Sequence, residues 1–267
     1  MTAMLILGLG YTASRLAARL EAQGWQVRAT NRDGRGGAIR FDDEDAVRAA
    51  IASSTHILSS VPPDRDGADP VLARYGAEVA RSPARWLGYL SSTGVYGDTA
   101  GAWVDESAAT GTGRRSARAQ ADAAWQALHP DARVFRLPGI YGPGRSALER
   151  VAEGRAHRIA LPAQVFSRVH VDDIVGAVVA SFGAGPAGVY NIADDRPASQ
   201  NAVIEEACRM LGLAAPPLMT LDEAGLSPAA RGFYAENRRV ANGKAKRLLG
   251  WRPLYPDYRR GLAACRA

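Results

Sequence analysis

The chain has 267 residues, of which 47% are apolar and 22% charged, and this composition excludes a disordered, collagen-like or coiled-coil chain. The net charge of +6 comes almost wholly from arginines scattered along an Ala- and Gly-rich sequence. The two cysteines, Cys208 and Cys265, lack CxxC spacing, which argues against a disulfide framework or a cysteine zinc site and favours a reducing cytoplasm.

Two classes of partner are disfavoured. No recognition helix, zinc finger or aromatic platform accompanies the arginines, so we expect no nucleic-acid partner. The longest uncharged run, 174–193, is broken by glycines and a proline at 183–188. We therefore predict a helix, a turn and a strand there rather than a membrane span, and expect a soluble protein with no membrane partner.

The first half of the chain alternates β-like runs with segments of helical periodicity. In chain order we predict a strand at 4–7, a helix at 15–20, strands at 26–30 and 39–41, a helix at 45–52, strands at 56–59 and 86–90, a helix at 117–128 and a strand at 133–137. Strands separated by helices favour a doubly wound parallel α/β sheet.

Beyond about residue 145 the alternation is looser. We predict helices at 172–181, 202–211 and 243–249, a strand at 189–192, and a Pro- and Ala-rich surface segment at 214–230. This half is expected to complete the sheet and to form a small C-terminal α/β cap.

A G-x-G-x-x-A motif spans residues 8–13, directly after the first predicted strand and at the start of the first helix. Its first glycine permits a tight turn, and its second lets the backbone approach a pyrophosphate held by the free N–H groups of the helix N-terminus. We therefore predict a Rossmann-like dinucleotide site. Its expected contacts here are Gly8, Gly10, Tyr11, Thr12 and Ala13.

The end of the second predicted strand indicates which dinucleotide binds. An NAD site usually has an acidic residue there, for the ribose 2′-hydroxyl, but here Thr30, Asn31 and Arg32 follow one another without an acid. Arg32 and the Thr30 hydroxyl would suit a 2′-phosphate. NADP is therefore predicted in preference to NAD.

Five further segments resemble the extended, NAD-dependent epimerase/dehydratase-like branch of the short-chain dehydrogenase/reductase superfamily. They are SSTGVYG at 91–97, RLPGIYGPG at 136–144, RVHVDDI at 168–174, VYNIA at 189–193 and KRLLGWRP at 246–253. The resemblance runs from about residue 3 to 263. It implies a dinucleotide-binding core at 1–145 and a segment at 146–267 that completes the sheet and caps the substrate.

The same resemblance suggests further cofactor contacts. Pro138, Gly139 and Ile140 would line the nicotinamide, Ser60, Val61 and Pro62 would pass near the adenine-side ribose, and Asp42 and Ser91 would also contact the cofactor. Acidic residues run from 42 to 45. They are better explained as a helix start than as a metal cluster, so no metal site is expected.

The superfamily catalyses with a Ser or Thr, a Tyr and a Lys. The resemblance gives the first role to Ser92, with Thr93 as the neighbouring alternative, and aligns the Tyr and Lys positions with Arg114 and Arg118. A guanidinium has a pKa above 12 and cannot exchange a proton near neutral pH. Arg114 would therefore stabilise an oxyanion, and Arg118 would bind ribose hydroxyls.

Another group would have to supply the proton in an ordinary reaction of this superfamily. Tyr96 is one candidate, and Tyr141 and His170 are others, although packing or hinge roles suit all three as well. A sequence without the catalytic tyrosine resembles the atypical, YeeZ-like group of the superfamily.

Function is predicted from these features together. We expect a cytoplasmic NAD(P)-binding oxidoreductase or epimerase/dehydratase-like enzyme for a small polar substrate, sugar-derived or anionic; a homodimer is allowed but not required. Basic residues concentrate late in the chain, and they either bind such an anionic substrate or form a solvated helix face: Arg231, Arg238, Arg239, Lys244, Lys246 and Arg247. The alternative is a catalytically inert NADP-binding sensor or scaffold.

Overall fold

The computed structural model describes residues 2–64, 67–113 and 116–266, and a parallel seven-stranded sheet forms its centre. The spatial order is β11-β7-β5-β4-β1-β2-β3. These strands are β1 (Ala3–Leu7), β2 (Gln26–Asn31), β3 (Ile39–Arg40), β4 (His56–Ser59), β5 (Trp86–Ser92), β7 (Ala132–Leu137) and β11 (Gly188–Asn191). The order reverses between β1 and β4, which confirms the predicted doubly wound Rossmann-like fold.

Helices cover both faces of the sheet because side chains along each strand alternate between the two faces. On β1, Met4 and Ile6 pack with α1 (Tyr11–Glu21) and α6 (Val171–Ala180). The intervening Leu5 and Leu7 pack against the other layer. That layer consists of α2 (Glu44–Ala52), α3 (Pro70–Ala80) and α4 (Ser116–Leu128).

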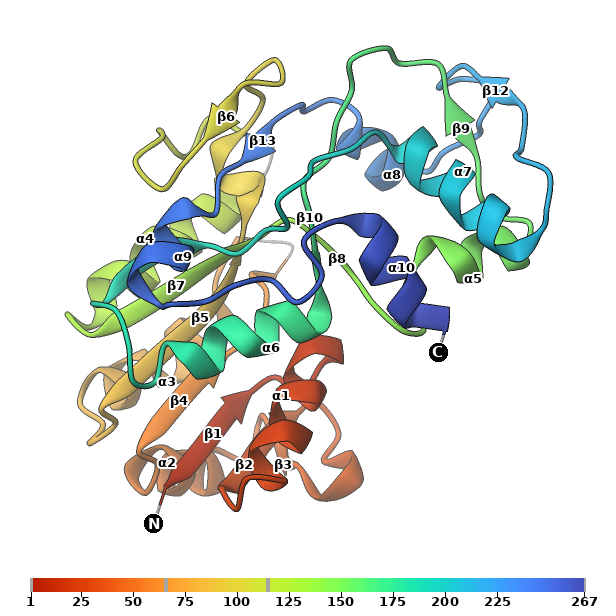
Figure 1. The fold of residues 1–267 in the computed structure, drawn as a ribbon. Coiled ribbons are helices and arrows are strands. Elements are labelled where there is room, and N and C mark those ends of the chain that lie inside the picture. The colour runs from red at the N-terminus through yellow and green to blue at the C-terminus, as the bar shows by residue number, and fades with distance from the viewer. Residues whose placement is uncertain (1, 65–66, 114–115, 267) are drawn as a thin grey trace.

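A smaller group of elements lies beyond the carboxyl ends of the strands (Figure 1). Its core is formed by α5 (Ala147–Ala152), α7 (Gln200–Leu211) and α10 (Tyr258–Arg266). Three pairs of short strands lie outside the central sheet: β8 (Gly139–Tyr141) with β10 (Arg168–His170), β9 (Arg158–Ile159) with β12 (Leu218–Met219), and β6 (Trp103–Val104) with β13 (Arg239–Val240). The remaining elements are α8 (Pro228–Phe233), α9 (Gly243–Leu248) and the 3₁₀ turns η1 (Arg35–Gly37) and η2 (Thr93–Tyr96).

Some elements differ from the predicted ones. The helix expected at 15–20 begins at Tyr11, directly after the glycine loop. Neither α3 nor α10 was predicted, and the segment 214–230, expected to be irregular, contains β12 and the start of α8. Within the described ranges, no helix is long and apolar enough to cross a membrane.

Candidate functional site

A cavity of about 950 Å³ lies where the carboxyl ends of the central strands meet the smaller group of elements. It brings together predicted site residues from segments far apart in the sequence. Those that line it are Gly10, Tyr11, Thr12, Ser60, Pro62, Ser91, Ser92, Thr93, Arg118, Pro138, Gly139 and Ile140. Open α/β sheets bind ligands at this edge, beside the point where the strand order reverses.

The two glycines of the loop differ in what surrounds them. Gly8 has a φ of +95°, and a Cβ there would lie 2.8 Å from Val61 Cγ2. Its N–H donates to Thr30 Oγ1 at 3.1 Å, and its carbonyl accepts from the Ser60 hydroxyl. Gly10, by contrast, has no protein atom within 4 Å of its Cβ position. Protein contacts therefore fix Gly8, while Gly10 borders open space.

The N-terminus of α1 opens beside Gly10 without a side-chain cap and without an acidic residue in the first turn. The first N–H groups of a helix lack intrahelical acceptors and carry the positive end of the helix dipole. Open space beside an uncapped helix N-terminus is the arrangement that a pyrophosphate needs. The residues of this loop therefore fit the dinucleotide that the sequence predicts.

Tyr11 connects the glycine loop to the segment that precedes α5. Its hydroxyl donates to the Pro143 carbonyl at 3.0 Å. The guanidinium groups of Arg15 and Arg145 each lie 5.6 Å from the centre of its ring, and burial is the main cause that raises the pKa of the Tyr11 hydroxyl. Tyr11 therefore acts as a wall of the cavity rather than as an acid.

The residues predicted for the 2′-phosphate lie outside this cavity. Thr30 is fully buried and its hydroxyl is used by Gly8, so it shapes the glycine loop. The Asn31 side chain accepts from Gly34 N–H at 2.6 Å and shapes the following turn. Arg32 is exposed and makes no hydrogen bond or ion pair with a described residue. Of these three residues, only Arg32 has an exposed side chain that could bind the phosphate of a ligand at the protein surface.

Asp42 and Ala13 also lie outside the cavity. The Asp42 carboxylate accepts from Arg40 Nε and Nη2 at 3.0 and 2.8 Å, and this ion pair lowers the pKa of Asp42. Ala13 is buried against the sheet, where the motif requires a small residue. The predicted contact of Asp42 with the adenine stays a prediction.

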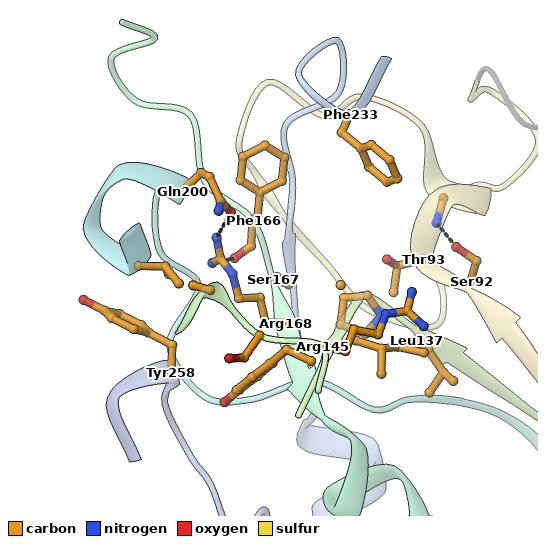
Figure 2. A pocket seen from close by; sticks show the side chains of 18 of the residues that line it. Ser92, Thr93, Leu137, Arg145, Phe166, Ser167, Arg168, Gln200, Phe233 and Tyr258 are labelled. Carbon is orange, nitrogen blue, oxygen red and sulfur yellow. Dashed lines mark hydrogen bonds between the residues drawn. The ribbon is translucent and has the colours of Figure 1, made fainter. Parts of the chain in front are cut away.

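The end of β5 supplies the hydroxyl groups of the site. Ser92 Oγ accepts from Gly94 N–H at 3.1 Å and so caps η2, which leaves the Ser92 hydroxyl proton available to a ligand. The Thr93 hydroxyl makes no hydrogen bond with a described residue, and Figure 2 shows both side chains at one side of the cavity. Arg118 reaches the same cavity from α4. Arg114 lies outside the described residues.

The structure places Tyr96 away from the cavity, so its predicted catalytic role does not fit. Its hydroxyl donates to Asn191 Oδ1 at 2.7 Å and accepts from Arg136 Nη1 at 2.9 Å, within the core. The Ser91 hydroxyl belongs to the same network, because it donates to Asp122 Oδ2 at 2.6 Å. Ser91 still lines the cavity, but its hydroxyl proton is already donated to Asp122 and is not available to a ligand.

Of the other two candidate acids, His170 is held by a hydrogen bond, whereas Tyr141 lines the cavity and its buried hydroxyl has no hydrogen-bond partner among the described residues. His170 Nδ1 accepts from Asp172 N–H at 3.2 Å and caps α6, and burial lowers the pKa of its imidazole. Tyr141 packs against the His170 ring at 5.3 Å, and its hydroxyl position lies 1.9 Å from where a Cβ on Gly261 would stand. Both residues join the sheet edge to α10.

The basic residues of the cavity are mostly not the ones predicted. Of the late cluster, only Arg238 lines it, while Arg231 and Lys246 pair with Asp222 and Asp195 elsewhere. The cations that sequence reasoning missed come from the middle of the chain: Arg145, Arg150, Arg155 and Arg168. The signal was present, because the first three are spaced five residues apart directly after the segment 136–144.

Comparison with solved structures agrees with this architecture. A conserved protein of unknown function from Silicibacter pomeroyi is 42% identical, with a TM-score of 0.88 over 100% of this chain and 98% of that one. A human epimerase family protein, solved with NADPH, has a TM-score of 0.79 at 18% identity and covers 99% of both chains. At that identity the second similarity concerns the fold alone.

Two curated relatives are similar in sequence. The protein YeeZ of Escherichia coli K12 is 27% identical, over 94% of this chain and 96% of its own length. The 3-diazoavenalumate denitrifying reductase of a Streptomyces species is 36% identical over 140 residues. That match covers 48% of this chain and 45% of the reductase, so it spans about half of either protein. No family model matches the chain.

Proposed function

The chain belongs to the extended short-chain dehydrogenase/reductase superfamily by its fold, its motifs and its full-length similarity to YeeZ, and we propose that it is a cytoplasmic, NADP-dependent oxidoreductase or epimerase-like enzyme. Its substrate would be small, polar and anionic. One observation carries the proposal: a single cavity joins an uncapped helix N-terminus, the hydroxyls at the end of β5 and a wall rich in arginine.

The cofactor would be held by the glycine loop and the sheet edge. The N–H groups at the start of α1, beside Gly10, suit its pyrophosphate. Pro138, Gly139 and Ile140 would line its other end, and Arg32, exposed and unpaired, favours the 2′-phosphate of NADP. When bound, the nicotinamide of such a cofactor supplies or accepts a hydride.

The chain's own residues would then orient and polarise the substrate. Ser92 Oγ accepts a hydrogen bond from Gly94 N–H, so the Ser92 O–H can donate to a substrate oxygen. The Thr93 hydroxyl, which has no hydrogen bond with a described residue, is available beside it. Arg118 adds a fixed positive charge at this end. Stabilisation of charge by preorganised donors is worth several kcal/mol in typical enzymes, roughly 2.7–4 per donor.

A second candidate is a redox-inert NADP-binding sensor, and the arginine at position 114 favours it. General acid–base assistance is typically worth roughly 10²–10⁴ in rate, and an arginine does not replace it. The partial similarity to a reductase favours the enzyme.

A thermal-shift titration with NADP, NADPH, NAD and NADH tests the cofactor. A ligand at a hundredfold excess over its Kd stabilises the folded state by about 2.7 kcal/mol, or roughly 5–10 °C in a chain of this size. We expect such a shift with the phosphorylated forms. No shift with any of the four would overturn both candidates.

Turnover distinguishes the enzyme from the sensor. NADPH oxidation is followed at 340 nm with a panel of carbonyl compounds, for the wild type and for Ser92→Ala. Because an epimerase returns the hydride to its substrate without net oxidation of NADPH, product formation from sugar-derived compounds is followed by chromatography with the same two proteins. An enzyme should turn over at least one compound, and Ser92→Ala should slow that turnover while the thermal shift with NADPH is kept. A normal thermal shift without turnover of any compound favours the sensor.

A further inference from the structure

A tight turn precedes α5 and lies against the glycine loop. Within it, the Arg145 N–H donates to the Gly142 carbonyl at 2.9 Å, and Gly144 has a φ of +75°. Pro143 stands between the two glycines. Proline in the second position and a positive φ in the third are typical of a type II β-turn. Residues 142–145 therefore form a defined β-turn, the 142–145 turn.

Side chains hold the 142–145 turn on two sides. On one side, the Tyr11 hydroxyl of α1 donates to the Pro143 carbonyl at 3.0 Å. On the other side, the Glu149 carboxylate of α5 accepts from the N–H groups of Gly144 and Ser146, at 2.8 and 2.7 Å. Contacts within the protein therefore fix the backbone of this turn in its place beside α1.

The Arg145 side chain at the end of this turn is available to a ligand. It is exposed, lines the cavity (Figure 2), and makes no hydrogen bond or ion pair with a described residue. Its guanidinium carbon lies 5.6 Å from the centre of the Tyr11 ring. Tyr11 is the first residue of α1, directly after Gly10, so this cation stands beside the helix N-terminus that suits a pyrophosphate.

Position, rather than the lack of a counter-ion, distinguishes Arg145 from other guanidinium groups nearby. Arg150 is also exposed and has no ion pair with a described residue, but it belongs to α5 and makes no hydrogen bond or ring contact with a described residue of α1. Arg15 is as close to the Tyr11 ring as Arg145 is, but it pairs with Asp172 at 3.0 Å. Among the described residues, Arg145 therefore combines a place beside the glycine loop with an unpaired charge.

A pyrophosphate at this point needs more positive charge than the helix supplies. The N-terminus of an α-helix carries only roughly half an elementary charge. Residues 8–14, which form the glycine loop and the first turn of α1, include no basic side chain. A guanidinium supplies a full charge, and its planar fork of N–H groups can pair with two phosphate oxygens at once.

We propose that Arg145 binds the cofactor's pyrophosphate from the cap side, so that the pyrophosphate lies between this guanidinium and the N-terminus of α1. The 142–145 turn is then a second wall of the cofactor site, in addition to the glycine loop. This role rests on the proposed function, because it requires a dinucleotide in the cavity. Arg145 binds a group that NADP and NAD share, whereas Arg32 is expected to bind the 2′-phosphate that NADP alone carries.

Isothermal titration of the full chain with three nucleotides tests this assignment. NADPH and NADH share the pyrophosphate and the nicotinamide and differ in the 2′-phosphate, and ADP-ribose has the pyrophosphate without the nicotinamide. Arg145→Gln should weaken the binding of all three by a similar factor, about tenfold or more, because hydrogen bonds to a charged group are lost. Arg145→Lys should restore part of the affinity, since lysine keeps the charge but not the planar fork.

Arg19→Gln is the matched control. Arg19 is exposed in the last turn of α1, so this variant loses the same charge at the opposite end of the same helix and should bind all three nucleotides as the wild type does. Added salt should weaken NADPH binding more steeply in the wild type than in Arg145→Gln, because salt screens an exposed charge. Thermal melts without ligand should coincide, since the Arg145 side chain makes no hydrogen bond with a described residue.

The pattern of losses decides between the possible roles of Arg145. Unchanged affinities in Arg145→Gln, or an equal loss in Arg19→Gln, would overturn the inference and leave the proposed function. A loss confined to NADPH would assign Arg145 to the 2′-phosphate, and a loss for NADPH and NADH but not for ADP-ribose would assign it to the nicotinamide end. Either result rejects the pyrophosphate contact. If the wild type binds none of the three, the proposed function fails, and this inference fails with it.

Discussion

Arg136 on β7 donates its Nη2 and Nε to the two carboxylate oxygens of Asp122 on α4, at 2.8 and 3.1 Å, and both residues are almost fully buried. The Ser91 and Tyr96 hydroxyls complete this network. It therefore ties the end of β5, where Ser92 stands, to both neighbouring elements. A buried and fully hydrogen-bonded ion pair of this kind fixes geometry more than it adds stability.

Removal of one partner of this pair should be strongly destabilising. Asp122→Ala leaves the Arg136 guanidinium buried without a counter-ion, and we expect a loss of about 3–5 kcal/mol in the free energy of unfolding. Urea denaturation at pH 7 measures it. Asp222→Ala is the control, because Asp222 is 88% exposed in its pair with Arg231 and should cost less than about 1 kcal/mol. Similar losses in both variants would contradict this interpretation.

The sequence was sufficient for the parts of the fold that local chemistry determines. Continuous apolar runs located β1, β4 and β5, and the glycine motif located the start of α1. Helix α3 could also have been found, since Asp69 caps it, Pro70 opens it, and Val71, Tyr75 and Val79 recur on one face.

The site was less predictable because tertiary contacts decide which side a residue faces. Tyr96 follows Ser92 by four residues in a recognisable motif, yet the 3₁₀ turn η2 directs it towards Arg136 in the core. The cavity lining combines Arg150 on α5 with Phe166 and Tyr234, and no local pattern in the sequence joins Arg150 to Tyr234, 84 residues later. Strands of two or three residues, such as β8 and β10, form only when the two segments meet.

The two glycines of the loop should respond differently to alanine. Gly8→Ala meets both a left-handed backbone and Val61, so we expect a loss of stability of about 1–3 kcal/mol or more, together with weaker NADPH binding. Gly10 has an extended backbone and open space, so Gly10→Ala should keep the melting temperature and lose the NADPH-induced shift. Thermal melts with and without NADPH measure both. An undiminished NADPH shift in Gly10→Ala would place the pyrophosphate elsewhere.

Arg32 should determine the choice between NADP and NAD. Its guanidinium has no partner among the described residues, so Arg32→Ala removes no internal contact and should leave stability within about 0.5 kcal/mol. The affinity for NADPH should fall about tenfold, and that for NADH should not change. Fluorescence titration of both nucleotides gives the ratio. Equal losses for NADPH and NADH would show that Arg32 does not read the 2′-phosphate.

His56 should make the stability of the sheet depend on pH. It lies on β4, 5% exposed, with its ring 4.8 Å from that of Trp25 and 4.9 Å from that of Phe182. Burial lowers its pKa to about 4, and the charges of Arg85 and Arg133 act in the same direction. The unfolded chain binds the proton near pH 6.5, so the folded state holds fewer protons between these two values.

The contribution of neutral His56 to the free energy of unfolding is therefore fully present above about pH 6.5 and is lost as the pH falls towards 4. The difference of about 2.5 pKa units corresponds to up to about 3 kcal/mol. His56→Asn should be less stable than the wild type at pH 7, because ring contacts are lost, and should lose less stability on acidification. Carboxylates titrate in both proteins, so the difference between their urea-unfolding curves at pH 7 and pH 4 isolates this residue. Parallel losses in the two proteins would mean that His56 can take up a proton within the folded sheet.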